Sequence, residues 1–185
     1  MSIYTRKGDK GKTSDLSGRE VSKNSAVIRF IGAADELNCH LGLIKAMITN
    51  EGAWQFSAKS TNSFLEKVQK NIGLIMSHVS DIKNSNFFLP EDEIVRLEKE
   101  IDRLYANIPK QTTLIVPGKN IIEAQIQIGR TIARRAESLF FAVMEIQPLR
   151  QEAGAYLNRL SDYLFVLSQQ ESLINVDFIN QVAGV

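Results

Sequence analysis

The chain contains very little cysteine and histidine. Cys39 is its single cysteine, and His40 and His78 are its two histidines. One cysteine excludes a disulfide bond within the chain and fits a reducing compartment, which we expect to be the cytoplasm. Three such side chains are too few for a typical Cys/His zinc site, so no certain set of protein metal ligands is predicted.

Strong net charge and long apolar runs are also missing. The formal net charge is +1, so no overall field favours nucleic acid or a membrane surface as a partner. No apolar run approaches the roughly 18 residues that a membrane span needs, and residues 1–8 contain no apolar stretch typical of a signal peptide. Any site for an anion must therefore be local.

What the chain does have is helical periodicity. Its 185 residues, 44% of them hydrophobic, suffice for one domain with a buried core. Apolar residues recur at spacings of three and four in five segments: about 32–49, 60–83, 90–108, 118–145 and 155–175. Residues 27–31 fit either the first helix or an extended lead-in. Because no alternating strand pattern is evident, we predict an all-α, up-down antiparallel five-helix bundle over residues 25–175. Residues 1–24 are predicted as a loop and residues 176–185 as a tail.

The segment 118–145 has two distinct faces at helical period. One face combines apolar and very small side chains: Ile122, Ile126, Gly129, Ala133, Ala136, Phe140 and Val143. This face predicts close approach of a neighbouring helix. On the other face, Arg130 and Arg134 lie one turn apart, with Arg135 beside them, an arrangement that suits a polyphosphate. The alternative is a solvated polar face in which Arg134 or Arg135 pairs with a nearby carboxylate.

Residues 4–13 are rich in glycine, lysine and hydroxyl side chains. Gly11, Lys12 and Thr13 imitate the end of a P-loop, but Arg6 stands where that motif requires glycine. The flanking strand and helix of a P-loop are not predicted either, so we reject that motif. The segment still offers backbone amides and cations for a phosphate cradle, and the alternative is a mobile basic arm.

Four motifs carry a family resemblance. They are Tyr4–Thr13, Gly32–Asn38, Pro117-Gly118 followed by Arg130–Glu137, and Leu157–Phe165. In this order, over about residues 3–168, they resemble the corrinoid adenosyltransferases of the PduO type. The resemblance implies a homotrimer that binds ATP and a corrinoid between subunits. It also implies transfer of the 5′-deoxyadenosyl group of ATP to Co(I) of the corrinoid, giving adenosylcobalamin and triphosphate.

The resemblance also implies roles for individual residues. The implied ATP-binding residues are Thr5, Arg6, Lys7, Gly8, Asp9, Gly11, Thr13, Lys23, Arg134, Glu137 and Asn158. Arg134 would neutralise the leaving phosphates, while Asp35 and Arg130 would form a salt bridge across the subunit boundary that shapes the catalytic site. Leu114, Asp35 and Asp162 would lie on the corrinoid side. Mg²⁺ would be held mainly by the phosphates of ATP.

Several positions depart from the family pattern. Leu114 stands where an aromatic residue is frequent, and Lys119, Gln127 and Ser138 also differ. These departures concern the corrinoid side more than the phosphate side. They leave open a non-catalytic relative that binds ATP or a corrinoid as a sensor or carrier. A plain helical interaction module is the third alternative. For the enzyme, a reductase that supplies Co(I) and a cobalamin-dependent client enzyme are expected partners.

Overall fold

Five α-helices make up most of the chain. The computed structural model describes residues 4, 6, 8–50, 58–109 and 114–183, without the side chains of residues 50 and 174–183. The helices are α1 (Ala26–Asn50), α2 (Ala58–Ser80), α3 (Asp92–Tyr105), α4 (Ile121–Met144) and α5 (Gln151–Ala183), with a short 3₁₀ turn, η2, at Ser85–Phe87. The predicted all-α five-helix bundle is confirmed.

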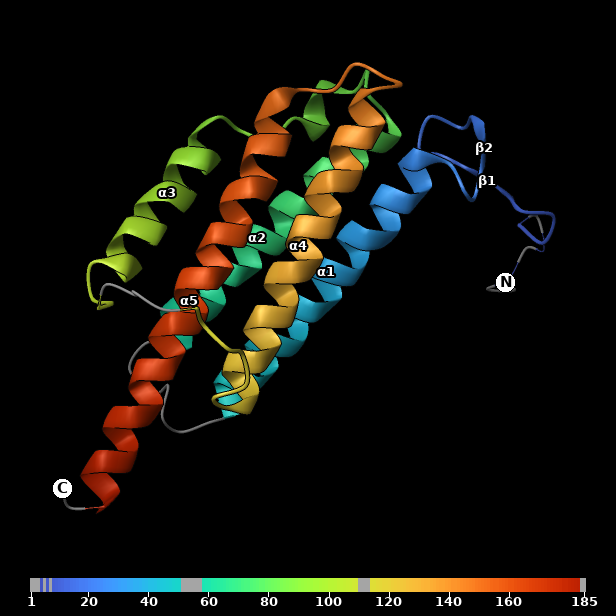
Figure 1. The fold of residues 1–185 in the computed structure, drawn as a ribbon. Coiled ribbons are helices and arrows are strands. Elements are labelled where there is room, and N and C mark those ends of the chain that lie inside the picture. The colour runs from blue at the N-terminus through green and yellow to red at the C-terminus, as the bar shows by residue number, and fades with distance from the viewer. Residues whose placement is uncertain (1–3, 5, 7, 51–57, 110–113, 184–185) are drawn as a thin grey trace.

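The long helices pack side by side (Figure 1). α1 packs against α2 and α4, α4 packs against α5, and α3 covers the outer side of α5. Within the described part of the chain, no helix is long and apolar enough to cross a membrane.

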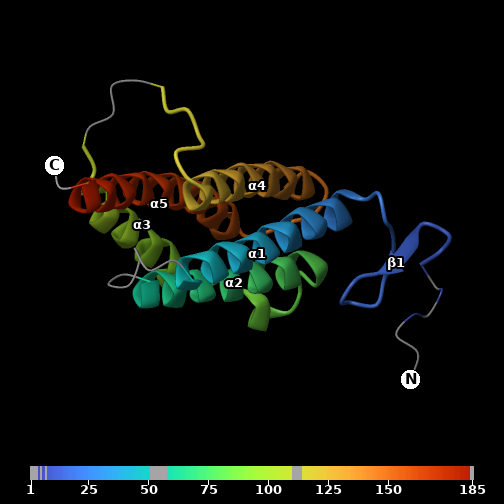
Figure 2. The ribbon, with the colours of Figure 1, turned by 90° about the horizontal axis from the view of Figure 1, so that it is seen from below.

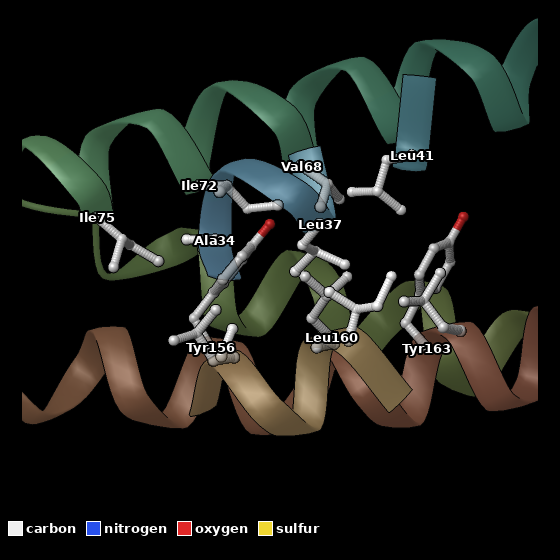
Figure 3. Close-up of a cluster of buried hydrophobic side chains, with 14 of the residues drawn as sticks. Ala34, Leu37, Leu41, Val68, Ile72, Ile75, Tyr156, Leu160 and Tyr163 are labelled. Atoms are coloured by element: carbon white, nitrogen blue, oxygen red, sulfur yellow. The ribbon is translucent and has the colours of Figure 1, made fainter. Parts of the chain in front are cut away.

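The core lies between these helices and follows the predicted apolar seams. Leu37, Leu41 and Ile44 on α1 and Ile72 on α2 are fully buried. Figure 3 shows such side chains from α1 and α2 meeting Tyr156, Leu160 and Tyr163 of α5. Burying one such aliphatic side chain stabilises the fold by about 1.5–3 kcal/mol, so these seams fix which faces of the helices meet.

Small residues bring α4 close to its neighbours, as the sequence predicted. A Cβ atom at Gly129 would lie 3.3 Å from both His40 Cδ2 and Ile44 Cδ1 of α1. A Cβ atom at Gly154 of α5 would lie 3.0 Å from Phe141 Cζ of α4. Glycine at these two positions therefore sets the spacing of α4 from α1 and from α5.

α1 begins at Ala26, so residues 27–31, which the sequence left open, belong to the helix. Other predicted helix limits were wrong, and α3 begins at Asp92 instead of Pro90. α5 begins at Gln151, so Gly154, which was predicted to precede the helix, lies inside it. There it packs against the Phe140 and Phe141 rings of α4. α5 also extends to Ala183, beyond the predicted end near residue 175.

The N-terminal segment contains a hairpin that the sequence did not predict. β1 (Lys12–Ser14) pairs antiparallel with β2 (Glu20–Ser22), with Thr13 opposite Val21. Asp15 closes the turn because its side chain accepts hydrogen bonds from the Ser17 hydroxyl and the Arg19 backbone N–H. Burial acts to raise the pKa of Asp15, but these bonds and the Arg19 guanidinium keep it below its ordinary value. Figure 2 shows the hairpin extending beyond the start of α1, away from the bundle.

Candidate functional site

The three arginines of α4 have different surroundings. Arg135 pairs with Glu36 of α1, and the half-buried Arg130 donates from Nε to Gln127 Oε1 at 2.7 Å. Arg134 is exposed and has no ion pair or hydrogen bond to any residue that the structure describes. The carboxylate pairing that the sequence left open therefore occurs at Arg135. Arg134 keeps its guanidinium available for an anionic ligand.

Asp35 does not meet Arg130 within one chain. Asp35 is exposed on α1 and forms no salt bridge with a described residue. Glu36 faces Arg135, and His40 Nε2 lies 2.9 Å from the Gln125 carbonyl oxygen, so α1 and α4 run antiparallel. No ion pair joins Asp35 to Arg130 among the described residues, and Arg130 Nε donates to Gln127 instead. The predicted Asp35–Arg130 pair thus stays a prediction about two subunits.

Polar residues of α4 and α5 meet beside the arginines. Asn158 Nδ2 donates to Glu137 Oε1 at 2.9 Å, which joins two residues predicted to bind ATP. Arg159 donates to Asn158 Oδ1 at 2.8 Å and from Nε to Glu98 Oε1 on α3 at 3.0 Å. Arg159 therefore fixes the amide of Asn158 from the side opposite Glu137.

Asp162 lies one turn beyond this network. It is exposed, and its Oδ2 lies 3.9 Å from Arg159 Nη1. This is the local pairing that the spacing of three residues allows. This pairing leaves Asp162 exposed, and its contact with the corrinoid stays a prediction.

Glycines of the N-terminal arm lie around Lys23. A Cβ atom at Gly8 would come within 2.9 Å of Lys23 Nζ. The Lys23 backbone N–H donates to the Gly11 carbonyl oxygen at 2.9 Å, and Gly11 has a φ of +77°. These contacts bring a predicted phosphate-binding cation to the glycine loop, where backbone amides also lie.

Other predicted residues of the arm are less strongly held. Arg6 has a φ of +59°, and its Cζ lies 5.6 Å from the centre of the Tyr4 ring. Asp9 is exposed, and Thr13 is half-buried within β1. Thr5 and Lys7 lie outside the described residues. In a single chain the hairpin of the arm extends past the start of α1, away from the helical bundle (Figures 1 and 2).

The loop before α4 presents apolar side chains to solvent. Leu114 is 92% exposed and Val116 is 74% exposed. The turn after them is held by the buried Glu123, whose Oε2 accepts from the backbone N–H groups of Gly118 at 2.7 Å and Lys119 at 3.1 Å. The loop thus holds exposed apolar groups on an anchored base, which suits a large apolar ligand or a neighbouring subunit.

The described residues contain no group of three or more His, Cys, Asp or Glu side chains arranged to hold a metal ion. Glu137, three residues after Arg134 on α4, and its partner Asn158 offer a carboxylate and an amide. They fit a metal ion that arrives with its own phosphate ligands better than a metal held by the protein alone.

Sequence reasoning placed Glu123 and Gln127 on the polar face of residues 118–145 but assigned no supporting role to them or to Glu36. Glu123 follows the Asn120 cap by three residues, and this spacing is a helix-start signal that could have found it. Gln127 precedes Arg130 by three residues, a spacing that places both on one helix face. Glu36 has no local signal, because its partner Arg135 is 99 residues away.

The fold and site together define a class: a helical bundle with a cationic helix face and a glycine-bearing arm suited to a polyphosphate. A family model described as cobalamin adenosyltransferase matches residues 3–171. The chain therefore belongs to the cobalamin adenosyltransferase family, as the four motifs indicated.

Similar proteins cover nearly the whole chain. A corrinoid adenosyltransferase of Citrobacter freundii is 31% identical over 91% of this chain and 94% of its own length. One of Bacillus subtilis is 32% identical over 91% of this chain and 86% of its own length. A variant PduO-type ATP:corrinoid adenosyltransferase from Lactobacillus reuteri, solved with cobalamin and ATP, superimposes with a TM-score of 0.84 at 27% identity. That superposition covers 94% of this chain and 92% of the other.

Proposed function

We propose that this chain transfers the 5′-deoxyadenosyl group of ATP to Co(I) of a corrinoid, giving adenosylcobalamin and triphosphate. The observation that carries the proposal is the family match over residues 3–171, which includes every described residue of the candidate site. The similar Lactobacillus reuteri protein was solved with both substrates, cobalamin and ATP.

The protein does not have to supply a nucleophile, because Co(I) is itself the nucleophile. The Co(I) electron pair forms the bond to C5′ while the C5′–O bond breaks, and that bonding pair leaves with the triphosphate. The protein must align the two substrates and stabilise the charge that develops on the leaving group. Arg134, exposed and unpaired among the described residues, supplies that cation. Glu137 and Asn158 lie beside it and fix the nucleotide.

The arm supplies the second set of phosphate contacts. Lys23 and the glycine loop at Gly8 and Gly11 support this role because cation and backbone amides lie together. We assign Thr5, Arg6, Lys7, Asp9 and Thr13 to the same loop on the resemblance. Mg²⁺ enters as part of its ATP complex, held mainly by the phosphates.

The corrinoid side is proposed to comprise Leu114, Asp35 and Asp162. Leu114 supports this role because it is almost fully exposed on an anchored loop. Burying it under the corrin would exclude water from the lower face of cobalt. Asp35 would reach Arg130 of a neighbouring subunit in a homotrimer, which accounts for the lack of that pair within one chain. We further propose that the enzyme acts in the cytoplasm with a reductase and a cobalamin-dependent client, because Co(I) needs a reducing supply.

The test is an assay with ATP, Mg²⁺ and chemically reduced cobalamin. We expect the absorption spectrum of a cobalt–carbon bond to develop together with stoichiometric triphosphate. If ATP binds and neither product forms, the chain is a non-catalytic relative. If neither substrate binds, the arginine face is a contact surface for another protein.

A further inference from the structure

A chain of hydrogen bonds, buried at the Gln127–Ser168 link, leads from Arg130 to α5. Arg130 Nε donates to Gln127 Oε1 at 2.7 Å, and Gln127 Nε2 donates to Ser168 Oγ at 2.9 Å. The Ser168 hydroxyl in turn donates to the Phe165 carbonyl oxygen at 2.7 Å. Gln127 is 4% exposed and Ser168 is fully buried. The side chain of Arg130 is thus tied to the backbone of another helix.

The direction of each bond in this chain is determined. The single proton of Ser168 is used on the Phe165 carbonyl, so Ser168 Oγ can only accept from its neighbours. Gln169 Nε2 also donates to it, at 3.1 Å. Gln127 must therefore turn its NH₂ group toward Ser168 and its carbonyl oxygen toward Arg130. A buried amide with both ends satisfied has a strongly preferred rotamer, since rotation would leave polar atoms unpaired.

We propose that Gln127 is a positioning residue that holds the Arg130 guanidinium toward the corrinoid side of the site, with Ser168 as its anchor. This inference rests on the proposed function. Nε of Arg130 is bound by Gln127, which leaves the two terminal nitrogens for the carboxylate predicted from Asp35 of a neighbouring subunit. Gln127, Arg130, Pro117 and Gly118 line one surface pocket of about 310 Å³. The held guanidinium therefore faces the turn that carries the Leu114 loop.

The neutral amide also makes this positioning independent of pH. A histidine at position 127 could donate to Ser168 and accept from Arg130 only while its ring is neutral. Protonation near its ordinary pKa of about 6.5 would turn the acceptor nitrogen into a donor facing a cation. The substitution Gln127→His would thus add to the activity a pH dependence that a purely structural role of Gln127 would not produce.

The experiment compares Gln127→Leu, Gln127→His and Ser168→Ala with wild type, and uses Gln125→Leu as the control. Gln125 is a half-buried glutamine of the same helix whose side chain forms no hydrogen bond to a described residue. We expect Gln127→Leu to lower kcat/KM for the corrinoid about tenfold, the usual size for losing one hydrogen bond to a charged group. The Kd for ATP should stay within about twofold. Ser168→Ala should shift the same parameter less, and Gln125→Leu should not shift it. Gln127→His should approach wild type at pH 8 and fall toward Gln127→Leu at pH 6.

Unchanged corrinoid kcat/KM in Gln127→Leu would overturn the inference while wild-type turnover still supported the proposed function. Equal losses of ATP and corrinoid affinity with a lowered Tm, or a flat pH profile in Gln127→His, would also overturn it. If the wild type showed no turnover, the proposed function would fail by itself. The affinity of the ATP-loaded protein for cob(II)alamin would then decide the positioning role. A weaker Kd in Gln127→Leu alone would support that role, and equal Kd values would refute it.

Discussion

Two adjacent arginines of α4, Arg134 and Arg135, differ in whether their charge is paired. Arg134 and Arg135 are adjacent and both exposed, yet only Arg135 pairs with a described carboxylate, that of Glu36. An exposed ion pair of this kind contributes at most about 1 kcal/mol to stability. The pair leaves one cation neutralised and its neighbour available for phosphate.

The two arginines therefore form a matched pair for mutation. We predict that Arg134→Ala lowers kcat by at least about 100-fold, the usual cost of losing one group that stabilises transition-state charge. Arg135→Ala should change kcat less than about threefold and Tm only slightly. Steady-state kinetics and circular dichroism of both variants check this. Full activity of Arg134→Ala, or equal losses in both variants, would contradict the role of Arg134.

The hairpin of the N-terminal arm does not contribute to the hydrophobic core that stabilises the helical bundle. The hairpin extends beyond α1, while the core lies among the helices (Figure 2). A substitution in the arm should therefore affect ligand binding more than folding. A substitution at a buried position of the bundle, such as His78, should do the reverse.

Substitutions at Gly8 and Lys23 test whether the arm affects ligand binding more than folding. We predict that Gly8→Ala displaces the Lys23 ammonium, because the new Cβ would lie 2.9 Å from Nζ. The affinity for ATP should fall several-fold at unchanged Tm, since the ammonium can move without disturbing the core. Lys23→Ala should cause a similar loss, and the double variant should lose little more. Isothermal titration with ATP checks this; additive losses would show that the two residues act independently.

His78 tests whether a buried position of the bundle affects folding more than ligand binding. It is buried on α2 against the Phe88 ring, and neither ring nitrogen has a hydrogen-bond partner among the described residues. Burial lowers the pKa of His78, and the positive charge of Arg150 adds to this, while Asp81 opposes it. Glu152, which pairs with Arg150, lines a small cavity together with His78.

Because the folded pKa is the lower one, the unfolded state binds more protons once the pH falls below about 6.5. We predict that the free energy of unfolding decreases from pH 7 to the folded-state pKa and that His78→Leu removes part of this decrease. Urea denaturation of both proteins at pH 7.5 and 5.5 measures it. Identical decreases in wild type and variant would contradict the assignment.

The sequence predicted what depends on local pattern. The seams of α1 to α5 were predictable because buried positions such as Leu41, Ile72 and Leu160 repeat at helical period. The hairpin was missed because strands of three residues are too short to show alternation. The Glu36–Arg135 pair and the Gln127–Ser168 bond depend on how separate helices register, which spacing along one helix cannot specify.

For the whole molecule, the central prediction is that the site needs more than one subunit. In one chain Asp35 forms no ion pair with a described residue, and the hairpin of the arm extends away from the bundle (Figure 2). A homotrimer would bring both onto a neighbouring α4. Sedimentation analysis should therefore give a mass near three chains.

Charge reversal can locate the Asp35–Arg130 pair. We predict that Asp35→Arg and Arg130→Asp chains are each inactive alone but regain activity when co-expressed. At a mixed interface, one contact would restore the native charges and the other would exchange them. A pair formed within a chain would stay mismatched in every mixture. A single chain carrying both substitutions serves as the positive control, and lack of recovery in the mixture alone would refute the intersubunit pair.

The most direct test of the whole account is a crystal structure of the wild-type protein with ATP and Mg²⁺. We predict that Arg134 of one subunit and the Gly8–Gly11 loop with Lys23 of an adjacent subunit contact the same triphosphate. Arg134 directed into solvent, with the arm bound elsewhere and the nucleotide held by other residues, would contradict the account.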